Sequence, residues 1–331
     1  MGDDEMREIG YACINMTLSD EGVCANRTLR MKTLEEKGYE YLSELIVSNL
    51  QSLKKILNWN AESGYRFYRM SSEMFPFMSH PVWGYDIENL PRCEEISTLL
   101  MELGNFARLT NQRLTYHPGP FNVLASPNPK VVSKTIVELN AHSHIFDLMG
   151  YTPSVENKIN IHVGGAYGDK ASALNRFCSN FQQLDENTKL RLTVENDDRG
   201  NLYSLQDLYL GVYQVIGIPL VFDYHHHVFN TGGLTEEEAL KLAMTTWPES
   251  IVPVVHYSES KTLEQGLTKI TPAHSDYIKG PINTYNQQVD VMVEAKAKEL
   301  AVQQYLSASS ASEQMPSASS ASEHTLSAHS A

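Results

Sequence analysis

Nine histidine and carboxylate residues of the sequence could bind divalent metal ions, and most of them end short β-type runs. Imidazole and carboxylate groups bind Mn²⁺, Zn²⁺ and Fe²⁺, and no thiolate belongs to this set. Two or three such ions can bind a phosphodiester, lower the pKa of a water molecule and stabilise the leaving oxygen. The residue types therefore predict a multinuclear metal site suited to phosphoester hydrolysis. The nine candidate positions are His80, His117, His162, Glu195, Asp223, the histidine run at 225–227, His256, His274 and Glu294.

Short runs of β-branched and aromatic residues alternate with amphipathic segments and would position these side chains. We predict strands at 7–14, 65–72, 113–117, 158–164, 190–196, 219–225, 252–258 and 273–278. Helical patterns lie at 39–57, 129–149, 204–217 and 284–304, and capping boxes begin at Ser204 and Thr235. This repeated alternation predicts an α/β fold of the TIM (β/α)8 barrel type, with a doubly wound sheet as the structural alternative.

Barrel enzymes build their sites at the carboxyl ends of the strands, which is where most of the candidate ligands fall. Glu195 is a natural bridging carboxylate in such a cluster. Adjacent residues point to opposite faces of a strand, so His225, His226 and His227 cannot all be ligands if they continue the sixth strand. We place Glu294 on the closing helix, from which it could reach the same rim.

The length of 331 residues fits one large barrel, which we assign to residues 1–305. Residues 306–331 form a Ser/Ala-rich tail that we expect to be disordered, because it has little apolar surface to offset its ordering entropy. The four cysteines are scattered, the acidic start has no secretory pattern, and no apolar run is long enough to span a membrane. We therefore expect an intracellular protein of the nucleus or cytoplasm.

The net charge of −14 argues against a strongly basic surface for nucleic acid. Bound divalent cations would add positive charge where a phosphate must lie. A local basic stretch could also contact a phosphate backbone, although the same residues could simply form a solvated surface. This stretch contains Arg27, Arg30, Lys32 and Lys37.

Ten short motifs in register with the predicted strands resemble those of the UV-damage DNA endonucleases. In chain order they read IGYACIN, RMSS, SHP, RLTYHPG, IHVGGAYGDK, LTVENDD, FDYHHH, HYS, AHSDYI and EAKAKE. The resemblance covers roughly residues 7–300 and implies a barrel of the endonuclease IV/xylose isomerase-like type. It also implies cleavage of double-stranded DNA immediately 5′ to a UV photoproduct, by a monomer that needs no protein partner.

The same resemblance assigns roles to individual residues. All nine positions would supply metal ligands, with His226 as the ligand from the run at 225–227. Glu195 would bridge two ions, and Glu195, His117 and His162 would be catalytic. The implied cofactor is Mn²⁺, with up to three ions, and Zn²⁺, Mg²⁺ or Co²⁺ are alternatives. Tyr11 and Asn15 match positions that touch the lesion, whose flipping costs less than that of an intact pair.

Two departures from the family pattern concern the lesion and the metals. Where the family usually has Gln and Tyr as a wedge after HPG, this chain has Pro120 and Phe121. Phe121 keeps an apolar wedge, whereas Pro120 has no hydrogen-bonding amide, so the lesion preference could differ. Many members carry a lysine that can be carboxylated two residues before the seventh-strand histidine, and here this position is Val254.

Other motif residues allow a structural or a functional interpretation. Gly164 and Gly165 favour a tight turn or a close backbone approach over a phosphate cradle. Asp197 and Asp198 could support ligands or cap the following segment. Lys170 could contact a DNA phosphate or simply begin a helix.

Two other functions fit parts of the sequence. A sugar isomerase or epimerase on a related barrel would also use His, Asp and Glu on divalent metals, but with fewer ligands. A lesion-binding protein without cleavage would explain the changes at Pro120 and Val254. The ordered motifs and the complete ligand set favour the endonuclease.

Overall fold

The computed structural model describes residues 6–313, with side chains described for residues 8–309, and shows a closed barrel of eight parallel strands. Each strand pairs with its neighbour in the sequence, and β8 pairs with β1 to close the ring. The predicted (β/α)8 barrel is therefore confirmed, and the doubly wound sheet is excluded. The strands are β1 (Met6–Ala12), β2 (Phe67–Met70), β3 (Arg113–Tyr116), β4 (Ile159–Ile161), β5 (Leu192–Glu195), β6 (Leu220–Asp223), β7 (Val254–Tyr257) and β8 (Val289–Val293).

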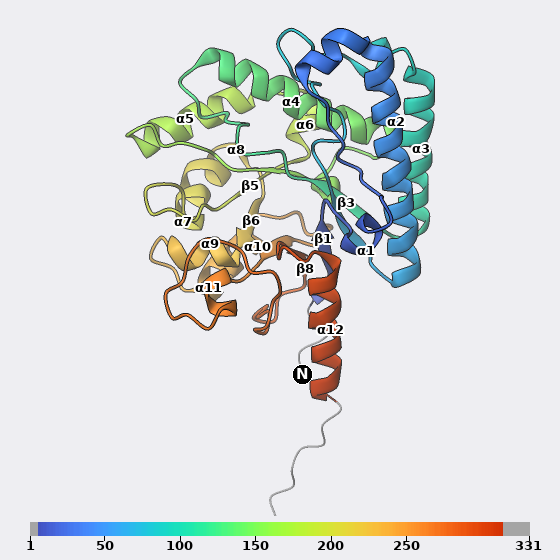
Figure 1. Ribbon diagram of the computed structural model, residues 1–331. Helices are drawn as coiled ribbons and strands as arrows, with labels where there is room; N and C mark the ends of the chain where they lie inside the picture. The colour runs from blue at the N-terminus through green and yellow to red at the C-terminus, as the bar shows by residue number, and fades with distance from the viewer. Residues whose placement is uncertain (1–5, 314–331) are drawn as a thin grey trace, which may run out of the picture.

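Helices surround the barrel, and the long pair α2 and α3 lies side by side along one flank (Figure 1). The main helices are α2 (Met31–Ser63), α3 (Cys93–Leu109), α4 (Pro129–Leu148), α5 (Lys170–Phe181), α10 (Glu236–Met244) and α12 (Glu299–Glu313). A composite helix consists of α7 (Leu205–Leu208), η3 (Tyr209–Tyr213) and α8 (Gln214–Ile216). The short elements are α1 (Met16–Ser19), η1 (Ile87–Asn89), η2 (Val155–Asn157), α6 (Glu186–Lys189), α9 (Tyr224–Phe229) and α11 (Lys261–Glu264).

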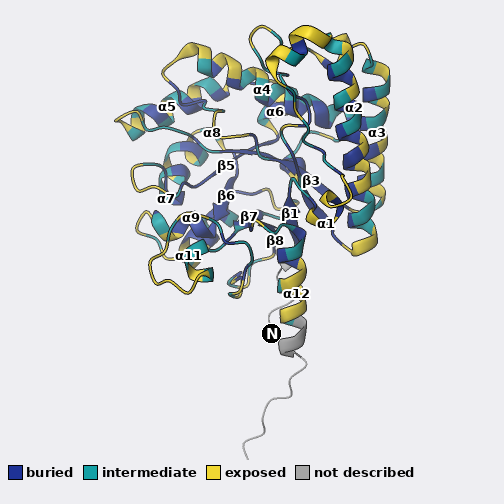
Figure 2. Ribbon diagram, viewed as in Figure 1, coloured by how far each residue is buried: buried dark blue, intermediate teal, exposed yellow. Residues whose placement is uncertain are grey.

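The sequence pattern explains why these segments fold as they do. The strands are buried on both faces, as parallel strands covered by helices must be, and the helices expose one side (Figure 2). Both predicted capping boxes are present, at Ser204–Asp207 and at Thr235–Glu238. None of the described helices is long and apolar enough to cross a membrane.

The barrel interior contains both apolar and polar side chains, among the latter the buried Lys158, Asn160 and Thr193. One apolar cluster inside it includes Phe67, Val221, Val254 and Met292. The layer of side chains at the carboxyl ends of the strands is instead made of histidines and carboxylates. This polar layer is the rim at which the sequence predicted a metal site.

The eighth strand was predicted at the wrong place. Residues 273–278 form no strand, and only His274 makes an isolated bridge, to Ser260. The strand that closes the barrel is β8, inside the predicted helix 284–304, and Glu294 directly follows it. The alternating Val289, Val291 and Val293 of β8 pack on one face of the sheet and Met292 packs on the other, which outweighs the helix propensity of the EAKAKE segment that follows.

The three consecutive histidines also lie in a different element from the predicted one. Strand β6 ends at Asp223, and His225, His226 and His227 belong to helix α9. The Asp223 side chain accepts a hydrogen bond of 2.7 Å from the backbone N–H of His226 and so caps this helix. The directions of the three histidine side chains therefore follow the helical period of about 3.6 residues and not the alternation of a strand.

Helix α12 continues beyond residue 305, where we expected the ordered barrel to end. The hydroxyl of Ser307 donates to the carbonyl of Gln303 at 2.8 Å, one helical turn earlier. The predicted disorder therefore does not apply to residues 306–313, and residues 314–331 lie outside the described part of the chain.

Candidate metal centre

Six consecutive strands each supply one candidate ligand to the same rim of the barrel. Glu195 and Asp223 are the last residues of β5 and β6, and His256 lies within β7. Strands β3, β4 and β8 are each followed directly by a candidate ligand, which is His117, His162 and Glu294, respectively. Parallel strands present their carboxyl ends together, so residues spread over about half of the chain converge at one place.

Glu195 lies at the middle of this cluster and is fully buried. Its Oε2 atom is 3.0 Å from His117 Nε2 and 3.0 Å from His256 Nδ1, while His162 Nε2 is 3.9 Å away. Its Oε1 atom is 3.3 Å from His226 Nδ1. A carboxylate with histidines on both oxygens has the arrangement of a bridging ligand.

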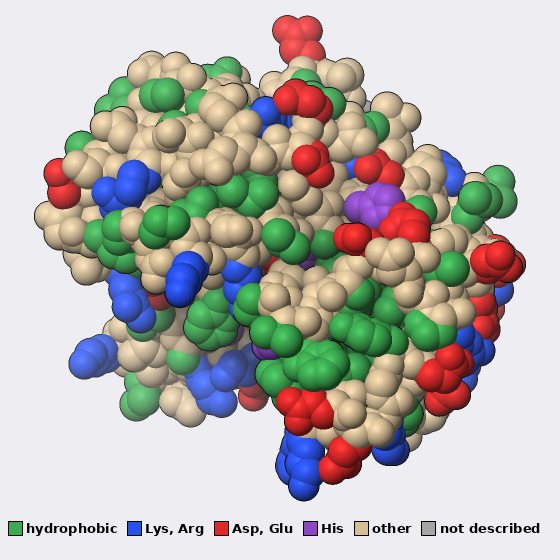
Figure 3. Space-filling model, turned by 90° about the horizontal axis from the view of Figure 1, so that it is seen from above, with side chains coloured by type: hydrophobic (Ala, Val, Ile, Leu, Met, Phe, Trp, Pro, Cys, Tyr) green, Lys and Arg blue, Asp and Glu red, His purple; other side chains and the backbone are tan. Residues whose placement is uncertain are grey.

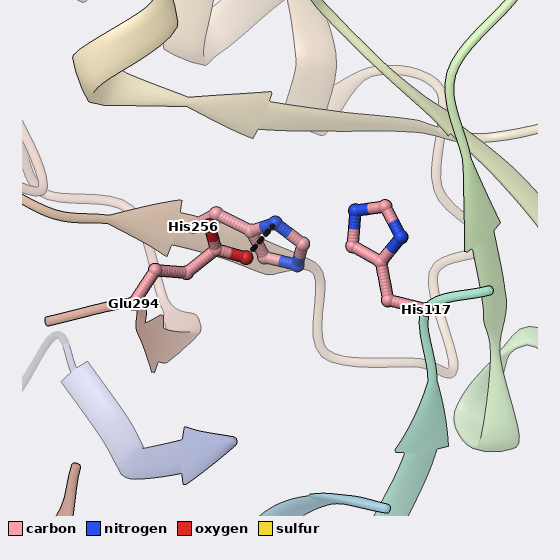
Figure 4. Close-up of side chains that lie close together, drawn as sticks. All are labelled: His117, His256 and Glu294. Carbon is pink, nitrogen blue, oxygen red and sulfur yellow. Dashed lines mark ion pairs between the residues drawn. The ribbon is translucent and has the colours of Figure 1, made fainter. Parts of the chain in front are cut away.

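The ligand atoms form three overlapping groups, in each of which all atoms lie within 4.8 Å of one another. One of these groups is drawn in Figure 4, where His256 Nδ1 lies 3.2 Å from Glu294 Oε1 and the His117 ring faces them from β3. Because the groups share members, several ions bound here would be close neighbours. The groups are His117, His256 and Glu294; His117, His162 and Glu195; and Glu195, Asp223 and His256.

Burial and charge divide four histidines of the cluster into two pairs, one with lowered and one with raised pKa values. Burial lowers the pKa of His256 to about 4 despite the nearby Glu195, and it also lowers the pKa of His117. Burial acts in the same direction at His162 and His226, but carboxylates outweigh it and raise their pKa values to about 9 and about 11. In the protein without metal, the second pair is therefore protonated at neutral pH and the first pair is neutral.

The carboxylates respond to the same surroundings. Burial opposes the ionisation of Glu195, yet His256 and His162 hold its pKa well below the usual range. At Glu294, Arg69 and His256 overcome burial and likewise lower the pKa. Burial raises the pKa of Asp223 to about 8, so this carboxyl is the one left short of positive charge.

The donor set fits divalent metal ions. The buried oxygens Glu195 Oε1 and Asp223 Oδ2 have no hydrogen-bond partner, although an unpaired buried carboxylate oxygen is costly. A divalent cation beside them would satisfy these atoms and compensate their charge. Imidazole nitrogens with carboxylate oxygens suit Mn²⁺, Zn²⁺ or Fe²⁺ equally well on chemical grounds.

Three polar residues that the sequence analysis did not single out hold the ligands in place. Asn160 donates a hydrogen bond to Glu195 Oε2 at 2.5 Å, and the Lys158 amine lies 3.3 Å from His256 Nε2. Arg69 on β2 forms an ion pair with Glu294. The alternation of Lys158, Asn160 and His162 along one strand face was a usable signal, because period two places all three inside the barrel.

Of the three consecutive histidines, only His226 faces the centre. His225 Nε2 donates to the backbone carbonyl of Pro272 at 3.1 Å, and His227 packs its ring against Phe222. The prediction of His226 as the ligand among the three thus agrees with the geometry. His226 faces the cluster because of its position in helix α9, and not because it lies on the inner face of a strand.

Besides His226, two predicted ligands lie outside the three groups, namely His80 and His274. His80, in the loop after β2, accepts hydrogen bonds on Nδ1 from the backbone N–H groups of Val82 and Trp83 at 3.2 and 3.0 Å. His274 is beside the cluster, with its ring 6.5 Å from that of His226, and its Nδ1 donates to the Glu294 carbonyl at 3.2 Å. In both residues one ring nitrogen is used by the backbone, which leaves Nε2 for any other role.

The predicted lesion contacts Tyr11 and Asn15 are buried. The Tyr11 hydroxyl donates to Asn60 at 2.6 Å and accepts from Asn15 at 2.9 Å, while Asn15 Oδ1 caps helix α1. With 0% and 2% of their surface exposed, these side chains offer no contact area to DNA in this conformation. Both residues brace the barrel from inside, and their contact with the lesion stays a prediction.

The other predicted DNA contacts differ in exposure. Pro120 is exposed and Phe121 is 87% exposed, in the loop between β3 and α4 at the rim. Lys170 instead begins helix α5 and pairs with Asp207 at 3.1 Å, as its structural interpretation expects. The geometry thus leaves Phe121 as the apolar side chain free to enter a duplex.

The remaining motif residues are mainly structural. Gly164 has a φ of 95°, which confirms a glycine requirement in the turn after β4. Asp197 Oδ1 lies 3.0 Å from His162 Nδ1, so it supports a ligand, whereas Asp198 is near Arg199 on the surface. Val254 is fully buried in the apolar cluster inside the barrel.

Charge is distributed unevenly on the face seen in Figure 3. Lysine and arginine side chains gather in the left half of this view, and most aspartate and glutamate side chains lie in the right half. The net charge of −14 therefore does not describe every part of the surface. Of the basic stretch, Arg27 is used locally, since it donates to the Gly22 carbonyl at 2.8 Å, and Lys32 lies 3.8 Å from Glu36.

Comparison with known proteins identifies the family. The sequence profile described as UV-endonuclease UvdE matches residues 7–323. A UV-damage endonuclease of Schizosaccharomyces pombe is 37% identical, with alignment over 89% of this chain and 49% of that protein. A UV DNA damage endonuclease of Bacillus cereus (strain Q1) is 31% identical, over 90% of this chain and 92% of that protein.

A solved structure supports the same relationship. The crystal structure of SacUVDE superposes with a TM-score of 0.77 at 31% identity, covering 93% of this chain and 99% of that one. This chain spans about half the length of the S. pombe relative and nearly all of the Bacillus relative. The match of nearly the whole chain to the family profile, with these relatives, confirms the predicted resemblance: the chain belongs to the UV-endonuclease UvdE family.

Proposed function

We propose that this protein is a metal-dependent DNA repair endonuclease that cuts double-stranded DNA immediately 5′ to UV photoproducts. The observation that carries the proposal is the convergence of six ligands from six strands around the buried Glu195. The relatives named as UV-damage endonucleases support the substrate. Other distorting lesions and abasic sites are further substrates, because the exposed Phe121 recognises distortion rather than one chemical group.

Divalent metal ions, Mn²⁺ in first place and up to three in number, would supply Lewis acid chemistry and an activated water when bound. Glu195 would hold the ions together with His117, His162 and His256, which all lie around its Oε2 atom. Glu294, Asp223 and His226 would be further ligands of the same cluster. Their fixed positions on strands pre-organise the site before the phosphate arrives.

The reaction is the addition of water to one phosphodiester. The bond between phosphorus and the 3′ oxygen breaks, which leaves a 3′-hydroxyl on one fragment and a 5′-phosphate on the other. Phe121 inserts its exposed ring into the distorted step, which positions the neighbouring phosphate over the rim. A single chain contains all of these groups, so we propose that a monomer is active.

The direct test uses an end-labelled duplex with a single photoproduct, incubated with the purified protein and Mn²⁺. The expected result is one nick immediately 5′ to the lesion and none in the undamaged duplex. Glu195→Gln should lose at least about 100-fold in rate, since it keeps the shape of the bridging group but not its charge. Leu109→Ala, which changes an exposed residue at the end of α3, is the matched control and should keep the wild-type rate.

Two results would overturn the proposal. One is the absence of any nick by the folded, metal-loaded protein. Another is isomerisation of a free ketose by the same preparation without activity on DNA. Tight binding to the lesion without cleavage in Mn²⁺, Mg²⁺, Zn²⁺ or Co²⁺ would instead identify a lesion-binding protein.

A further inference from the structure

Tyr167 is an exposed aromatic residue at the rim of the barrel that belongs to none of the three ligand groups. It lies in the loop between β4 and α5 and is 51% exposed. Its backbone has a φ of 51°, a region that residues other than glycine seldom adopt. Such a conformation persists only where the surroundings hold it, and it often marks a functional position.

The loop that carries Tyr167 is in direct contact with the loop that carries Phe121. A Cβ atom added at Gly164 would lie 2.6 Å from Val123 Cγ1, so only glycine permits this approach of the two loops. Phe121 and Val123 belong to the same loop between β3 and α4, and this loop is therefore fixed against the one after β4.

Helix α5 braces the same pair of loops. Arg176 Nε donates to the Ala125 carbonyl at 2.8 Å, and Asn180 donates to the Leu124 carbonyl at 2.7 Å. The loops are thus held by hydrogen bonds as well as by packing. A surface held in this way loses little conformational entropy when a ligand binds.

The Tyr167 ring has a cation beside it. The guanidinium carbon of Arg176 lies 5.5 Å from the ring centroid, on the side where the arginine also reaches Ala125. The ring is close to the backbone at Gly165, where an added Cβ would be only 3.1 Å from it. Within the described residues, the terminal nitrogens of Arg176 make no hydrogen bond that would prevent them from facing a phosphate.

We propose that Phe121, Tyr167 and Arg176 form one preformed surface, the aromatic rim, which binds the unstacked nucleotides of a distorted DNA strand. Tyr167 stacks on a base next to the one displaced by Phe121, and Arg176 contacts the adjacent phosphate. Stacking on an aromatic face tolerates any base, which suits an enzyme that recognises distortion. The proposal deepens the proposed function, on which it rests, by naming the residues that select unstacked over stacked DNA.

The test compares Tyr167→Ala with Tyr167→Phe on a duplex that contains one photoproduct. The alanine variant should weaken binding, measured as KM and as Kd by fluorescence anisotropy, by about 5- to 150-fold, the range expected for loss of one stacked base. The phenylalanine variant keeps the ring and should restore binding to within about threefold of wild type. Leu109→Ala removes a side chain that is 84% exposed at the opposite rim and should bind as wild type does.

A second substrate separates stacking from a general loss of affinity. The aromatic rim predicts that Tyr167→Ala loses most of its preference for the photoproduct duplex over the intact duplex. Equal loss on both duplexes, or unchanged binding to the photoproduct duplex, would overturn the inference. Circular dichroism and bound-metal content verify that the variant is folded.

Failure of this inference is distinguishable from failure of the proposed function. If wild type nicks the photoproduct duplex and Tyr167→Ala matches it in KM, Kd and preference, the aromatic rim is refuted while the endonuclease stands. If wild type itself neither binds nor nicks that duplex, the proposed function fails first, and the aromatic rim fails with it.

Discussion

The side-chain amide of Asn160 donates a hydrogen bond to Glu195 Oε2, and the hydroxyl of Thr193 donates at 2.8 Å to the Asn160 carbonyl oxygen. The ionised carboxylate fixes which end of the amide faces it, because it can only accept a hydrogen bond and therefore requires the N–H donor. All three residues are fully buried. The Asn160 amide therefore orients the Glu195 carboxylate from inside the barrel. Because this amide is neutral, it does not compete with the ligands for a metal ion.

This relationship predicts that Asn160→Asp weakens metal binding. The change keeps the size of the side chain but removes the donor and places a second carboxylate against Glu195. Metal affinity, measured by competition with a coloured chelator, should fall by about 10- to 100-fold. Thr193→Val should show a smaller loss and Thr193→Ser should restore it; equal affinity in all three variants would contradict the positioning role.

The ion pair between Arg69 and Glu294 predicts a large stability cost for Arg69→Met. Both side chains are only 13% exposed, so the variant leaves a buried carboxylate without its partner. The free energy of unfolding of the metal-free protein should fall by about 3–5 kcal/mol in urea denaturation. Arg69→Met combined with Glu294→Gln should recover part of this loss, and additive losses in the double variant would show that the pair is not coupled.

The histidine pKa values predict that metal binding releases protons. His162 and His226, with pKa values raised to about 9 and about 11, are charged at neutral pH and must lose a proton to become ligands. Asp223, with a pKa of about 8, releases a further proton. Apparent affinity should therefore rise with pH below about 8, by about tenfold per pH unit for each proton released.

Calorimetric titration of the metal in buffers with different ionisation enthalpies measures this proton release directly. His162→Gln removes one titrating ligand, so the number of protons released should fall by about one, whatever the loss of affinity. An affinity that does not change with pH between about 6 and 8 would mean that these side chains do not bind the ions.

The buried amine of Lys158 predicts an unusual dependence of stability on pH. Burial lowers its pKa from 10.5 to about 7, so between these values the unfolded chain binds more protons than the folded one. The contribution of Lys158 to the free energy of unfolding of the metal-free protein should consequently increase as pH rises through this window, opposite in sign to the contributions of His162 and His226, whose pKa values are raised. Urea denaturation of wild type and Lys158→Met isolates this contribution: the free energy of unfolding of wild type relative to the variant should increase with pH, and a difference that does not change with pH would contradict it.

Seven strands could be predicted from the sequence because each is a short run of β-branched or aromatic residues. The eighth could not, because two segments competed for it. Residues 273–278 have an aromatic and histidine pattern typical of a rim strand, but the Glu264 carboxylate accepts hydrogen bonds from the backbone of Asp276 and Tyr277 and holds them as a loop. The real strand is followed directly by strong helix formers, which obscured its end.

The site was predictable to the extent that it depends on strand ends. His117, His162, Glu195, Asp223 and His256 follow from the period of two and the rule that barrel sites lie at the carboxyl ends. The burial of Tyr11 could not be predicted, because its hydroxyl partner Asn60 is 49 residues away on α2. Contacts of this kind depend on how helices pack around the barrel, which local pattern does not encode.

The ring of strands closes only when β8, near the end of the described chain, pairs with β1. Arg69 on β2 reaches across this seam to Glu294 beyond β8, so the last ligand is fixed by a residue synthesised long before it. The centre is consequently complete only when the barrel is closed. Binding of metal ions would therefore indicate that the barrel is closed, and bound ions would oppose the separation of β8 from β1.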